Sequence, residues 1–265
     1  VGVRGTSGRE YKADAVLVAT GGLSYPTTGS TGDGYKLARQ AGHTLVEPVP
    51  SLVSLVSHDA DCKKMMGLAL KNVTLTLHED GKPIFEEQGE MLFTHFGVSG
   101  PLVLSASSRI ADSPEGVRLT IDMKPGLTPD ELDRRILRDF EKYQRKQLIN
   151  GLNDLLPSRL IPVVISISGV PAEINISSVT KAMRESLVKT VKCIPLIVDH
   201  ALPVEEAIIT RGGISVKEID PSTMESKLVP GLFFAGEIID VDGYTGGFNL
   251  QIAYSTGVLA GRSVR

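Results

Sequence analysis

The 265-residue chain has a formal net charge of −3, a sequence pI near 6.0 and 42% hydrophobic residues, enough to bury the core of one large or two modest domains. This charge gives no overall attraction to nucleic acid or to an anionic membrane, and no apolar run is long enough to span a bilayer. The two cysteines, Cys62 and Cys193, lie far apart, which excludes a disulfide framework and a cysteine-based metal site and indicates a reducing, cytoplasmic compartment.

The first residues predict a β-ribbon that turns at Ser7 and Gly8. The chain begins at Val1 inside this ribbon, with no methionine and no basic segment that would start a signal peptide. We therefore expect that an upstream segment is missing from the chain.

An apolar run over residues 15–19 then leads directly into Gly21 and Gly22. Consecutive apolar residues are typical of a strand that is buried on both faces in a parallel sheet. A loop rich in Gly, Ser and Thr follows, and a helical pattern is predicted over residues 35–41. The backbone N–H groups of this loop could face a phosphate or a flavin edge, but a long turn in which Asp33 caps the helix explains the same pattern.

Residues 45–50 contain two prolines and are interpreted as a linker. Beyond them, short apolar segments separated by turns predict an antiparallel sheet or a small barrel. Asp80 and Gly81 have the signature of a tight hairpin turn. Strands are expected over residues 52–57, 73–78, 84–85, 91–93, 102–104 and 117–121.

A helical segment starts at a capping box formed by Thr128 and Glu131. Further helices are expected over residues 152–156, 158–167 and 179–191. The basic residues between Arg134 and Lys146 alternate with Asp and Glu, which is typical of a solvated helix face. Strand-like residues return at 193–198 and 206–210, and a glycine hinge is expected at residues 211–214.

The C-terminal residues 232–265 have the pattern of a cofactor-binding end. An apolar strand runs into Gly236 and Glu237, and a glycine-rich loop then opens a helix. The N–H groups and dipole of such a helix N-terminus favour negative charge, as on the edge of a reduced flavin, and Glu237 is placed to accept hydrogen bonds from ribityl hydroxyls. An ordinary strand-to-helix turn explains the same glycines.

The sequence assigns no catalytic acid or base firmly. Tyr25, His95 and Arg211 are candidates by chemistry alone. Ser99 stands near a glycine pair, but Pro101 occupies the position where a serine nucleophile elbow needs a second glycine. The histidines lack the spacing of zinc ligands, so we expect no metal site.

Five ordered motifs resemble the aminoacetone oxidase-like family of bacterial three-domain flavoproteins, which are described as NAD(P)/FAD-dependent oxidoreductases. They extend over almost the whole chain: residues 19–26 (ATGGLSYP), 28–35 (TGSTGDGY), 89–101 (GEMLFTHFGVSGP), 212–218 (GGISVKE) and 236–257. The first two are also similar to segments of the fumarate reductase flavoprotein group that lie against FAD.

The resemblance implies an α/β fold, α+β overall, with a partial Rossmann-like FAD domain that carries an inserted β-rich domain and a nested helical domain. The FAD domain then takes residues 1–46 and 212–265. The β-rich domain takes residues 47–126 and 193–211, and the helical domain takes residues 127–192.

The resemblance also implies which residues bind FAD. Those that line the cofactor are Ala19, Thr20, Gly21, Gly22, Asp33 and Asp240. Those at the ribityl chain are Gly236 and Glu237, and those at the pyrimidine edge of the isoalloxazine are Gly246, Gly247, Asn249, Leu250 and Gln251.

One part of the family pattern is absent from the sequence. Families of this type carry an N-terminal strand, a Gly-x-Gly-x-x-Gly turn and a helix that hold the adenosine half of FAD, and residues 29–34 have the wrong spacing for that turn. We therefore expect the chain as it stands to bind FAD weakly or not at all, and the missing FAD-domain segment is an expected partner.

The leading hypothesis is that the parent protein is an FAD-dependent oxidoreductase that accepts a hydride from a small amine or from NAD(P)H. A second hypothesis is a cofactor-free remnant or interaction module of such a flavoprotein. A third keeps the flavin and changes the task to reduction of an unsaturated or keto substrate, such as a steroid-like acid. The sequence leaves the substrate, the electron donor and the oligomeric state open.

Overall fold

The structure is a computed structural model that describes residues 1–110 and 117–264. Residues 111–116 of the predicted β-rich domain and Arg265 of the predicted FAD domain lie outside the described residues. The chain divides into two compact units, which we describe one at a time. Unit 1 comprises Val1–Val53 and Leu202–Arg265, and unit 2 comprises Ser54–Ala201.

Unit 1 contains a parallel pair of strands from the two ends of the chain. β3 (Val16–Val18) pairs with β13 (Leu232–Phe234) in a register that places Val18 opposite Phe234. Both strands come from the apolar runs that predicted buried parallel strands. The two glycine-rich segments of the sequence therefore follow neighbouring strand ends.

An antiparallel pair completes the strands of unit 1. β4 (Leu45–Ser51) pairs with β12 (Ile209–Ile214), and a parallel bridge between Ile214 and Ile239 connects this pair to the segment after β13. The short hairpin of β1 (Gly2–Arg4) and β2 (Glu10–Lys12) is the ribbon predicted at the start of the chain.

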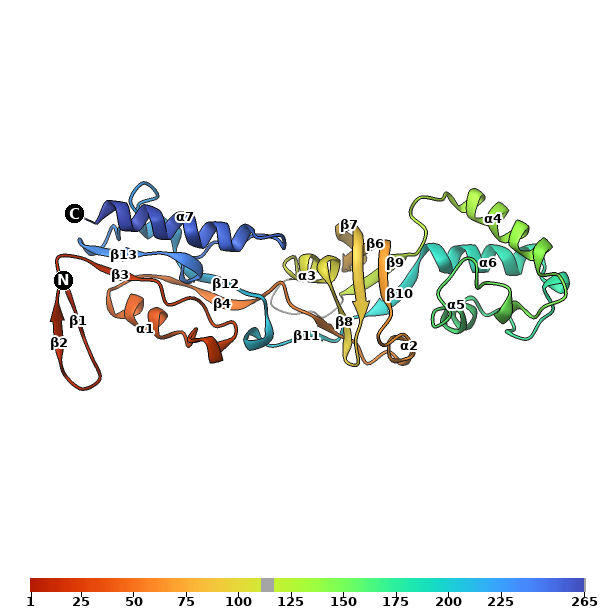
Figure 1. Ribbon diagram of the computed structural model, residues 1–265, viewed down its shortest axis with the longest axis horizontal. Helices are drawn as coiled ribbons and strands as arrows, with labels where there is room; N and C mark the ends of the chain where they lie inside the picture. Colours follow the sequence, from red (N-terminus) through yellow and green to blue (C-terminus); the bar gives the residue numbers. More distant parts are fainter. Residues whose placement is uncertain (111–116, 265) are drawn as a thin grey trace. The chain divides into compact units, whose positions relative to one another are not determined.

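Two helices lie on opposite sides of the unit 1 strands (Figure 1). They are α1 (Asp33–Gln40) and α7 (Phe248–Ser263). Short 3-10 turns link the elements: η1 (Pro26–Thr28), η4 (Val204–Glu206), η5 (Val216–Glu218) and η6 (Gly236–Ile238). This helix–strand–helix layering agrees with the predicted α/β fold class.

Two predictions about unit 1 are wrong. Residues 45–50 are a strand and not a linker, because β4 is an edge strand, where the missing N–H groups of its prolines cost no ladder hydrogen bond. Residues 211–214 are part of β12 and not a hinge. Gly212, with φ of 91°, sits at a bulge where a Cβ atom would lie 2.4 Å from the carbonyl oxygen of Glu47.

Unit 2 contains a seven-stranded antiparallel sheet, as the run of short predicted strands indicated, in the order β10-β9-β6-β7-β8-β5-β11. The bounds are β5 (Leu55–Val56), β6 (Ala69–Glu79), β7 (Lys82–Phe93), β8 (Gly97–Ser99), β9 (Arg118–Asp122), β10 (Ile194–Ile197) and β11 (His200–Ala201). The predicted hairpin is present: β6 and β7 are joined at Asp80 and Gly81, whose φ angles are 50° and 77°.

The helices of unit 2 are α2 (Ala60–Lys64), α3 (Pro101–Ser107), α4 (Pro129–Lys142), α5 (Ile161–Ser168) and α6 (Lys181–Lys192), with the 3-10 turns η2 (Leu148–Asn150) and η3 (Ile176–Ser178). The capping box predicted for α4 is present. Residues 102–104 are helical and not a strand, since Pro101 occupies the first helical position and the apolar residues that follow pack on one side of α3.

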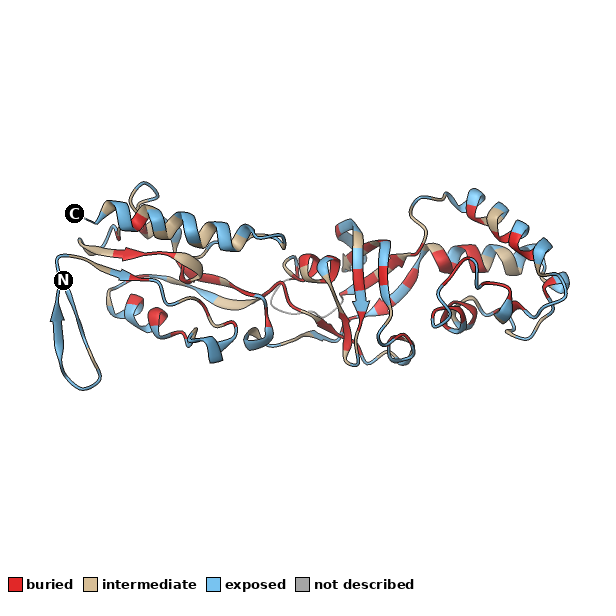
Figure 2. Ribbon diagram, in the orientation of Figure 1, coloured by how far each residue is buried: buried red, intermediate tan, exposed pale blue. Residues whose placement is uncertain are grey.

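Burial differs between the elements (Figure 2). The strands of unit 2 and the inner faces of α4, α5 and α6 contribute to one large apolar cluster. In contrast, α7 contributes only Ala260 to the smaller cluster of unit 1. The two units divide at residues 53/54 and 201/202, because β4 and β12 pair inside unit 1. The predicted division into three domains stays a prediction.

Candidate functional site

The carboxyl ends of β3 and β13 place two polar loops side by side. The N–H of Ala235, directly after β13, donates to the carbonyl of Val18, the last residue of β3, over 3.2 Å. Residues 19–22 continue from one strand and residues 235–237 from the other. Because ligands of open α/β sheets bind at the carboxyl ends of the strands, this edge is the candidate site.

Thr210 of β12 holds these loops together. This side chain is 1% exposed, and its Oγ1 accepts hydrogen bonds from the N–H groups of Leu23 at 2.8 Å and Ser24 at 3.2 Å. The N–H of Thr210 donates to Oε1 of Glu237 over 2.8 Å. One buried threonine thus connects the loop after β3 to the acid after β13, although no sequence motif pointed to it.

Gly22 is the point of closest approach between the loops. A Cβ atom on Gly22 would lie 2.3 Å from Oγ1 of Thr210 and 2.7 Å from Oε1 of Glu237. These distances leave no room for a side chain. The structure therefore brings Gly22 and Glu237, two of the predicted cofactor residues, to the same point.

Helix α1 packs against the loop after β3. A Cβ atom on Gly34 would lie 2.1 Å from Oγ1 of Thr20 and 2.4 Å from Cδ1 of Ile238, which belongs to η6. A Cβ atom on Gly21 would lie 2.7 Å from Oγ of Ser30. Thr20 and Gly21 are therefore packed against α1, its preceding loop and η6 on one side, although Thr20, like Ala19, is exposed overall.

Asp33 does not cap α1. The N-cap residue is Gly32, and the Asp33 carboxylate lies 2.8 Å from Nζ of Lys36. Hydrogen bonds from Lys36 and Thr31 lower the pKa of Asp33. Asp33 is therefore an exposed, ionised group at the first turn of the helix.

The N-terminus of α7 is open. Its N-cap residue is Gly247, with φ of 93°, and no side chain caps the first turn. Asn249 folds back onto the preceding loop, where it accepts a hydrogen bond from the N–H of Gly243 and donates one to its carbonyl, both at 2.8 Å. The N-cap glycine supplies no side-chain cap, so the first N–H groups of α7, at the positive end of the helix dipole, favour a carbonyl or anionic group there.

Three further predicted residues lie at this helix start. Gly246 has φ of 106°. Leu250 is 62% exposed, and Gln251 is exposed with its amide donating to Oγ of Ser255. None of them contributes to the buried core of unit 1.

A second polar cluster follows η6. Burial raises the pKa of Asp240, as does the neighbouring Asp242, while Arg211 lowers it. Asp242 accepts a hydrogen bond from the buried hydroxyl of Ser51 over 3.2 Å. Asp240 therefore keeps its proton to a higher pH than an ordinary aspartate, which makes it a candidate acid.

Tyr35 of α1 is buried near these carboxylates. The residue is 5% exposed, and its hydroxyl has no hydrogen-bond partner among the residues that the structure describes. Burial raises the pKa of Tyr35, and the charges of Glu237 and Asp240 raise it further. A buried phenol without a partner is rare in folded proteins, and it fits a site that receives another polar group. The sequence analysis included Tyr35 in a helical pattern and in the motif of residues 28–35, but gave its hydroxyl no role.

The three acid–base candidates from the sequence lie in different places. Arg211 belongs to the cluster with Asp240. Tyr25 is 46% exposed on unit 1 and has a left-handed backbone with φ of 49°. His95 belongs to unit 2, where it packs edge-on against Phe96 with ring centres 4.9 Å apart.

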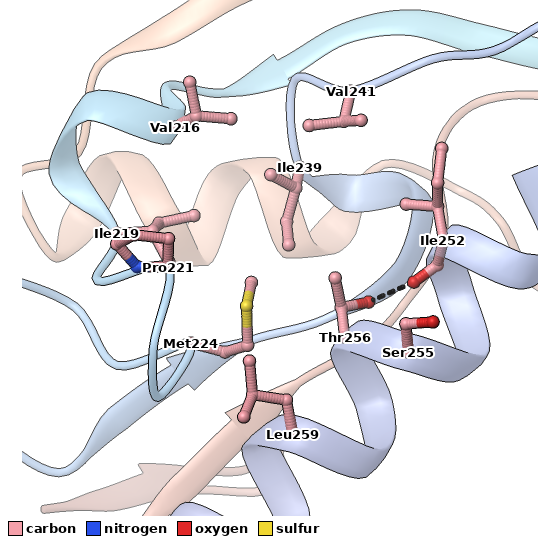
Figure 3. A pocket seen from close by; sticks show the side chains of 10 residues that line it. All are labelled: Val216, Ile219, Pro221, Met224, Ile239, Val241, Ile252, Ser255, Thr256 and Leu259. Atoms are coloured by element: carbon pink, nitrogen blue, oxygen red, sulfur yellow. Dashed lines mark hydrogen bonds between the residues drawn. The ribbon is translucent and has the colours of Figure 1, made fainter.

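An apolar cavity of about 300 Å³ lies beside α7 in unit 1 (Figure 3). Its lining side chains come from α7, from the segment around η5 and from the segment after η6. Thr256 of α7 connects this wall to the strand end, because its Oγ1 accepts a hydrogen bond from the N–H of Gly236 over 3.0 Å and donates one to the carbonyl of Ile252 over 2.8 Å. The position of Gly236 is therefore fixed by α7.

These features fit the isoalloxazine and ribityl half of FAD. The N-terminus of α7 suits the pyrimidine edge, the Glu237 carboxylate suits ribityl hydroxyls, and Gly22 lets the loop after β3 approach Thr210 and Glu237 closely. No group of three or more His, Cys, Asp or Glu side chains in the described part of the chain is arranged to hold a metal ion. No helix within residues 1–110 and 117–264 is long and apolar enough to cross a membrane.

Comparison with known proteins identifies relatives over nearly the whole chain. A family described as "HI0933-like protein Rossmann domain" matches residues 1–263. The chain is 32% identical over 260 residues to the 3-dehydro-bile acid delta(4,6)-reductase of Clostridium scindens. It is 32% identical over 257 residues to the ribosomal RNA dihydrouridine synthase of Haemophilus influenzae, and 29% identical over 250 residues to that of Escherichia coli.

The relatives are longer than this chain. The three alignments cover 97%, 96% and 94% of the chain but only 63%, 61% and 60% of the respective relatives. The chain thus spans less than two thirds of the length of these curated proteins.

Proposed function

The chain belongs to the HI0933-like family of Rossmann-domain proteins, and on that premise we propose that it forms part of a flavin-dependent oxidoreductase that reduces a carbon–carbon double bond. The names of the relatives support the reaction type. A delta(4,6)-reductase and a dihydrouridine synthase both saturate a carbon–carbon double bond, although their substrates differ in size and chemistry. This choice favours the unsaturated-substrate hypothesis, and the predicted small amine substrate has no support among these relatives.

The observation that carries the proposal is the meeting of the two glycine-rich segments at one strand edge. The register of β3 with β13, the Thr210 hydrogen bonds and the packing of Gly34 on Thr20 all fix that edge. When bound, a reduced flavin supplies a hydride to one carbon of an activated double bond. The residues of the chain bind and orient the cofactor around that chemistry.

Each residue of the edge has a role in this proposal. Glu237 accepts hydrogen bonds from ribityl hydroxyls, and the first N–H groups of α7 stabilise negative charge at the pyrimidine edge, an effect of about 0.3–2 kcal/mol. Asp240, whose pKa burial and the neighbouring Asp242 raise, is the group proposed to donate a proton to the second carbon of the double bond. Tyr25, His95 and Arg211 stay untested candidates for further acid–base roles.

The adenosine half of FAD needs additional protein, and unit 1 offers a place for it. α7 leaves Leu250, Tyr254 and Val258 exposed by 62%, 66% and 52%, and β3 pairs on one edge only among the described strands. We propose that a dinucleotide-binding strand–helix segment covers these surfaces, and that NAD(P)H is the electron donor. Exposed parallel strands and apolar helix faces of this size are normally covered in α/β proteins.

Flavin titration tests the proposal. Adding the 265-residue chain to FAD should quench flavin fluorescence only at high protein concentration, because the adenosine half has no site in this chain, and Glu237→Gln should raise the Kd about 10-fold because charge-assisted hydrogen bonds are lost. Glu47→Gln, a change at an exposed carboxylate on β4, is the matched control and should leave the Kd unchanged. If flavin fluorescence is not quenched at any protein concentration, the cofactor-free remnant is the better description of the isolated chain. Equal Kd values for Glu237→Gln and the unmodified chain would reject the role of Glu237.

A further inference from the structure

The apolar cavity beside α7 has no role in the proposed reaction. Its floor is formed by the buried side chains of Ile219, Met224 and Ile239. The exposed side chains of Val216 and Val241 stand at its rim, and all five surround one space in Figure 3. A cavity of about 300 Å³ with these walls has the size and the lining of a small-molecule pocket.

Two hydroxyl groups in the described wall already form hydrogen bonds within α7. Oγ1 of Thr256 donates to the carbonyl of Ile252 over 2.8 Å, and Oγ of Ser255 accepts from the amide of Gln251 over 2.9 Å. The other lining side chains are aliphatic or, at Met224, a thioether. A sugar or a phosphate would lose its hydrogen bonds to water here and find few partners, so the walls select an apolar occupant.

The volume of the cavity sets the size of this occupant. An apolar cavity of about 150 Å³ accepts the six carbons of benzene, so a cavity of about 300 Å³ corresponds to roughly 12 non-hydrogen atoms. Among the described lining residues, none offers an aromatic ring for stacking, whereas Met224 adapts to a flexible chain. The lining thus fits an alkyl chain of about eight to twelve carbons.

The charges next to the lining favour an uncharged head group over an anionic one. Among the described residues, Lys217 is the basic residue that adjoins a lining residue in the chain. Five acids adjoin lining residues: Glu218, Asp220, Glu225, Asp240 and Asp242. A carboxylate at the mouth of the cavity would therefore meet a surplus of negative charge.

The cavity shares its walls with the candidate site at the strand ends. Thr256 lines the cavity, and its Oγ1 accepts the hydrogen bond from the N–H of Gly236 over 3.0 Å. Ile239, in the floor, donates its N–H to the carbonyl of Gly236 over 3.2 Å. Both backbone groups of Gly236 are thus held by residues that line the cavity. An occupant packed against Thr256 and Ile239 restrains the turn that carries Glu237.

We propose that this cavity is a second binding site, which takes an uncharged alkyl chain and tightens flavin binding through Gly236. A ligand that binds better to one arrangement of a turn favours that arrangement, so the alkyl chain favours the position of Glu237 that flavin needs. By linkage, flavin strengthens alkyl binding by the same factor. The coupling rests on the proposed function, whereas alkyl binding itself does not.

Alkyl binding is measured with 1-octanol as the probe, by methyl NMR of the 265-residue chain without flavin. The methyl signals of Ile219, Met224 and Ile239 should shift in a saturable manner, while those of Ile121 and Ile136 in the core of unit 2 should not. Octanoate has the same chain length and should bind about 5-fold more weakly, because its carboxylate is repelled by the acids next to the lining.

Two substitutions to tryptophan separate the cavity from general surface effects. Val241→Trp places a large ring at the rim and should raise the Kd for octanol about 10-fold. Val258→Trp is the matched control, because Val258 is an exposed residue of α7 outside the lining, and the Kd should change less than about twofold. Thermal unfolding of both variants checks that the fold is retained.

Coupling is measured by titrating riboflavin with the chain and following the quenching of its fluorescence, with and without saturating octanol. Octanol should lower the riboflavin Kd about 5-fold. Thr256→Val removes the acceptor of the Gly236 N–H, so octanol should still bind while its effect on riboflavin disappears. Thr256→Ser keeps the acceptor and should keep the effect.

Different results would overturn the two parts of the proposal. Unshifted methyl signals, an unchanged Kd in Val241→Trp, or equal Kd values for octanol and octanoate would overturn the uncharged alkyl site. A riboflavin Kd that octanol leaves unchanged would overturn the coupling. Octanol binding without any riboflavin quenching rejects the proposed flavin site and the coupling but supports the alkyl site, whereas riboflavin quenching without methyl shifts rejects only the alkyl site.

Discussion

The two units differ in how they bury their apolar residues. The apolar cluster of unit 2 contains 39 buried residues among those described, and it joins the sheet to α4, α5 and α6. The cluster of unit 1 contains 12, although unit 1 includes α7, the longest helix among the described residues. Most of α7 stays outside that cluster, with Phe248, Leu250 and Tyr254 each exposed by 60% or more.

Unit 2 is stabilised by its own large apolar core, whereas unit 1 is arranged around the candidate site. Unit 2 obtains its order from side-chain packing. In unit 1, the buried polar groups Thr210, Ser24 and His43 hold loops in place through hydrogen bonds, and an apolar helix face is left free. We expect that unit 1 gains stability from a ligand or a further segment, because anything that binds only the folded state stabilises it.

The largest expected effect is in the core of unit 2. Phe93→Ala, at a residue that is 1% exposed, should lower the free energy of unfolding by about 3–5 kcal/mol, because it removes buried area and leaves a cavity. Phe248→Ala is the matched control in unit 1; the side chain is 60% exposed, so the change should stay within about 0.5 kcal/mol. Urea unfolding monitored by circular dichroism measures the free energy of unfolding of both variants. If the two lose similar stability, the Phe248 side chain is covered in solution.

An intermediate effect is expected at the hydrogen bonds of unit 1. Thr210→Val keeps the shape of the side chain but leaves the N–H groups of Leu23 and Ser24 without their acceptor, which should cost about 1–3 kcal/mol. Thr210→Ser keeps the hydroxyl and should recover most of this loss. Thr27→Val, at an exposed threonine of η1, is the control and should have little effect. Unfolding curves in which Thr210→Val and Thr27→Val coincide would contradict the role assigned to Thr210.

The smallest expected effect is a pH dependence confined to unit 1. His43 is buried, with Nε2 2.8 Å from Oγ of Ser226, and burial lowers its pKa below the ordinary 6.5 although Glu218 opposes this shift. Since the unfolded state then binds the proton more readily, stability is complete above pH 6.5 and falls as the pH drops below it, by at most about 1.4 kcal/mol per pH unit.

A second loss follows at lower pH, because hydrogen bonds from Thr44 hold the pKa of Glu218 below 4.5. Its contribution to stability is present above pH 4.5 and is lost as the pH falls through the lowered pKa. Between pH 7.5 and 5.5 only the His43 contribution changes, so thermal unfolding in this range should show a Tm of unit 1 that falls as the pH is lowered. His43→Gln should flatten this dependence, and an unchanged slope in that variant would assign it to another group.

Local patterns in the sequence were sufficient for much of the fold. The Asp80–Gly81 hairpin, the capping box of α4 and the strand runs before both glycine-rich loops need only neighbouring residues to be recognised. The errors occurred where distant pairing decided the outcome. Pro48 and Pro50 indicated a linker, yet β12 provides a partner for β4 that local pattern cannot reveal. Residues 102–104 looked like a strand, because a short apolar run does not distinguish strand from helix.

In the candidate site, too, local patterns identified some residues, and others depend on contacts between distant parts of the chain. The motifs predicted Gly22 and Glu237, since glycine and an acid directly after apolar strands have a recognisable pattern. Thr210, Tyr35 and Asp242 were missed, because a buried threonine, an orphaned phenol and a bonded aspartate acquire their roles only from residues far away in the sequence.

The sequence alone determined the α/β class, the order of the glycine-rich motifs and the family resemblance, because these depend on residue types at short spacing. Only the tertiary structure decided that Thr210 joins Gly22 to Glu237. The physical reason is that hydrogen bonds and ion pairs act over a few ångströms of space, and their partners here come from separate strands, helices and loops.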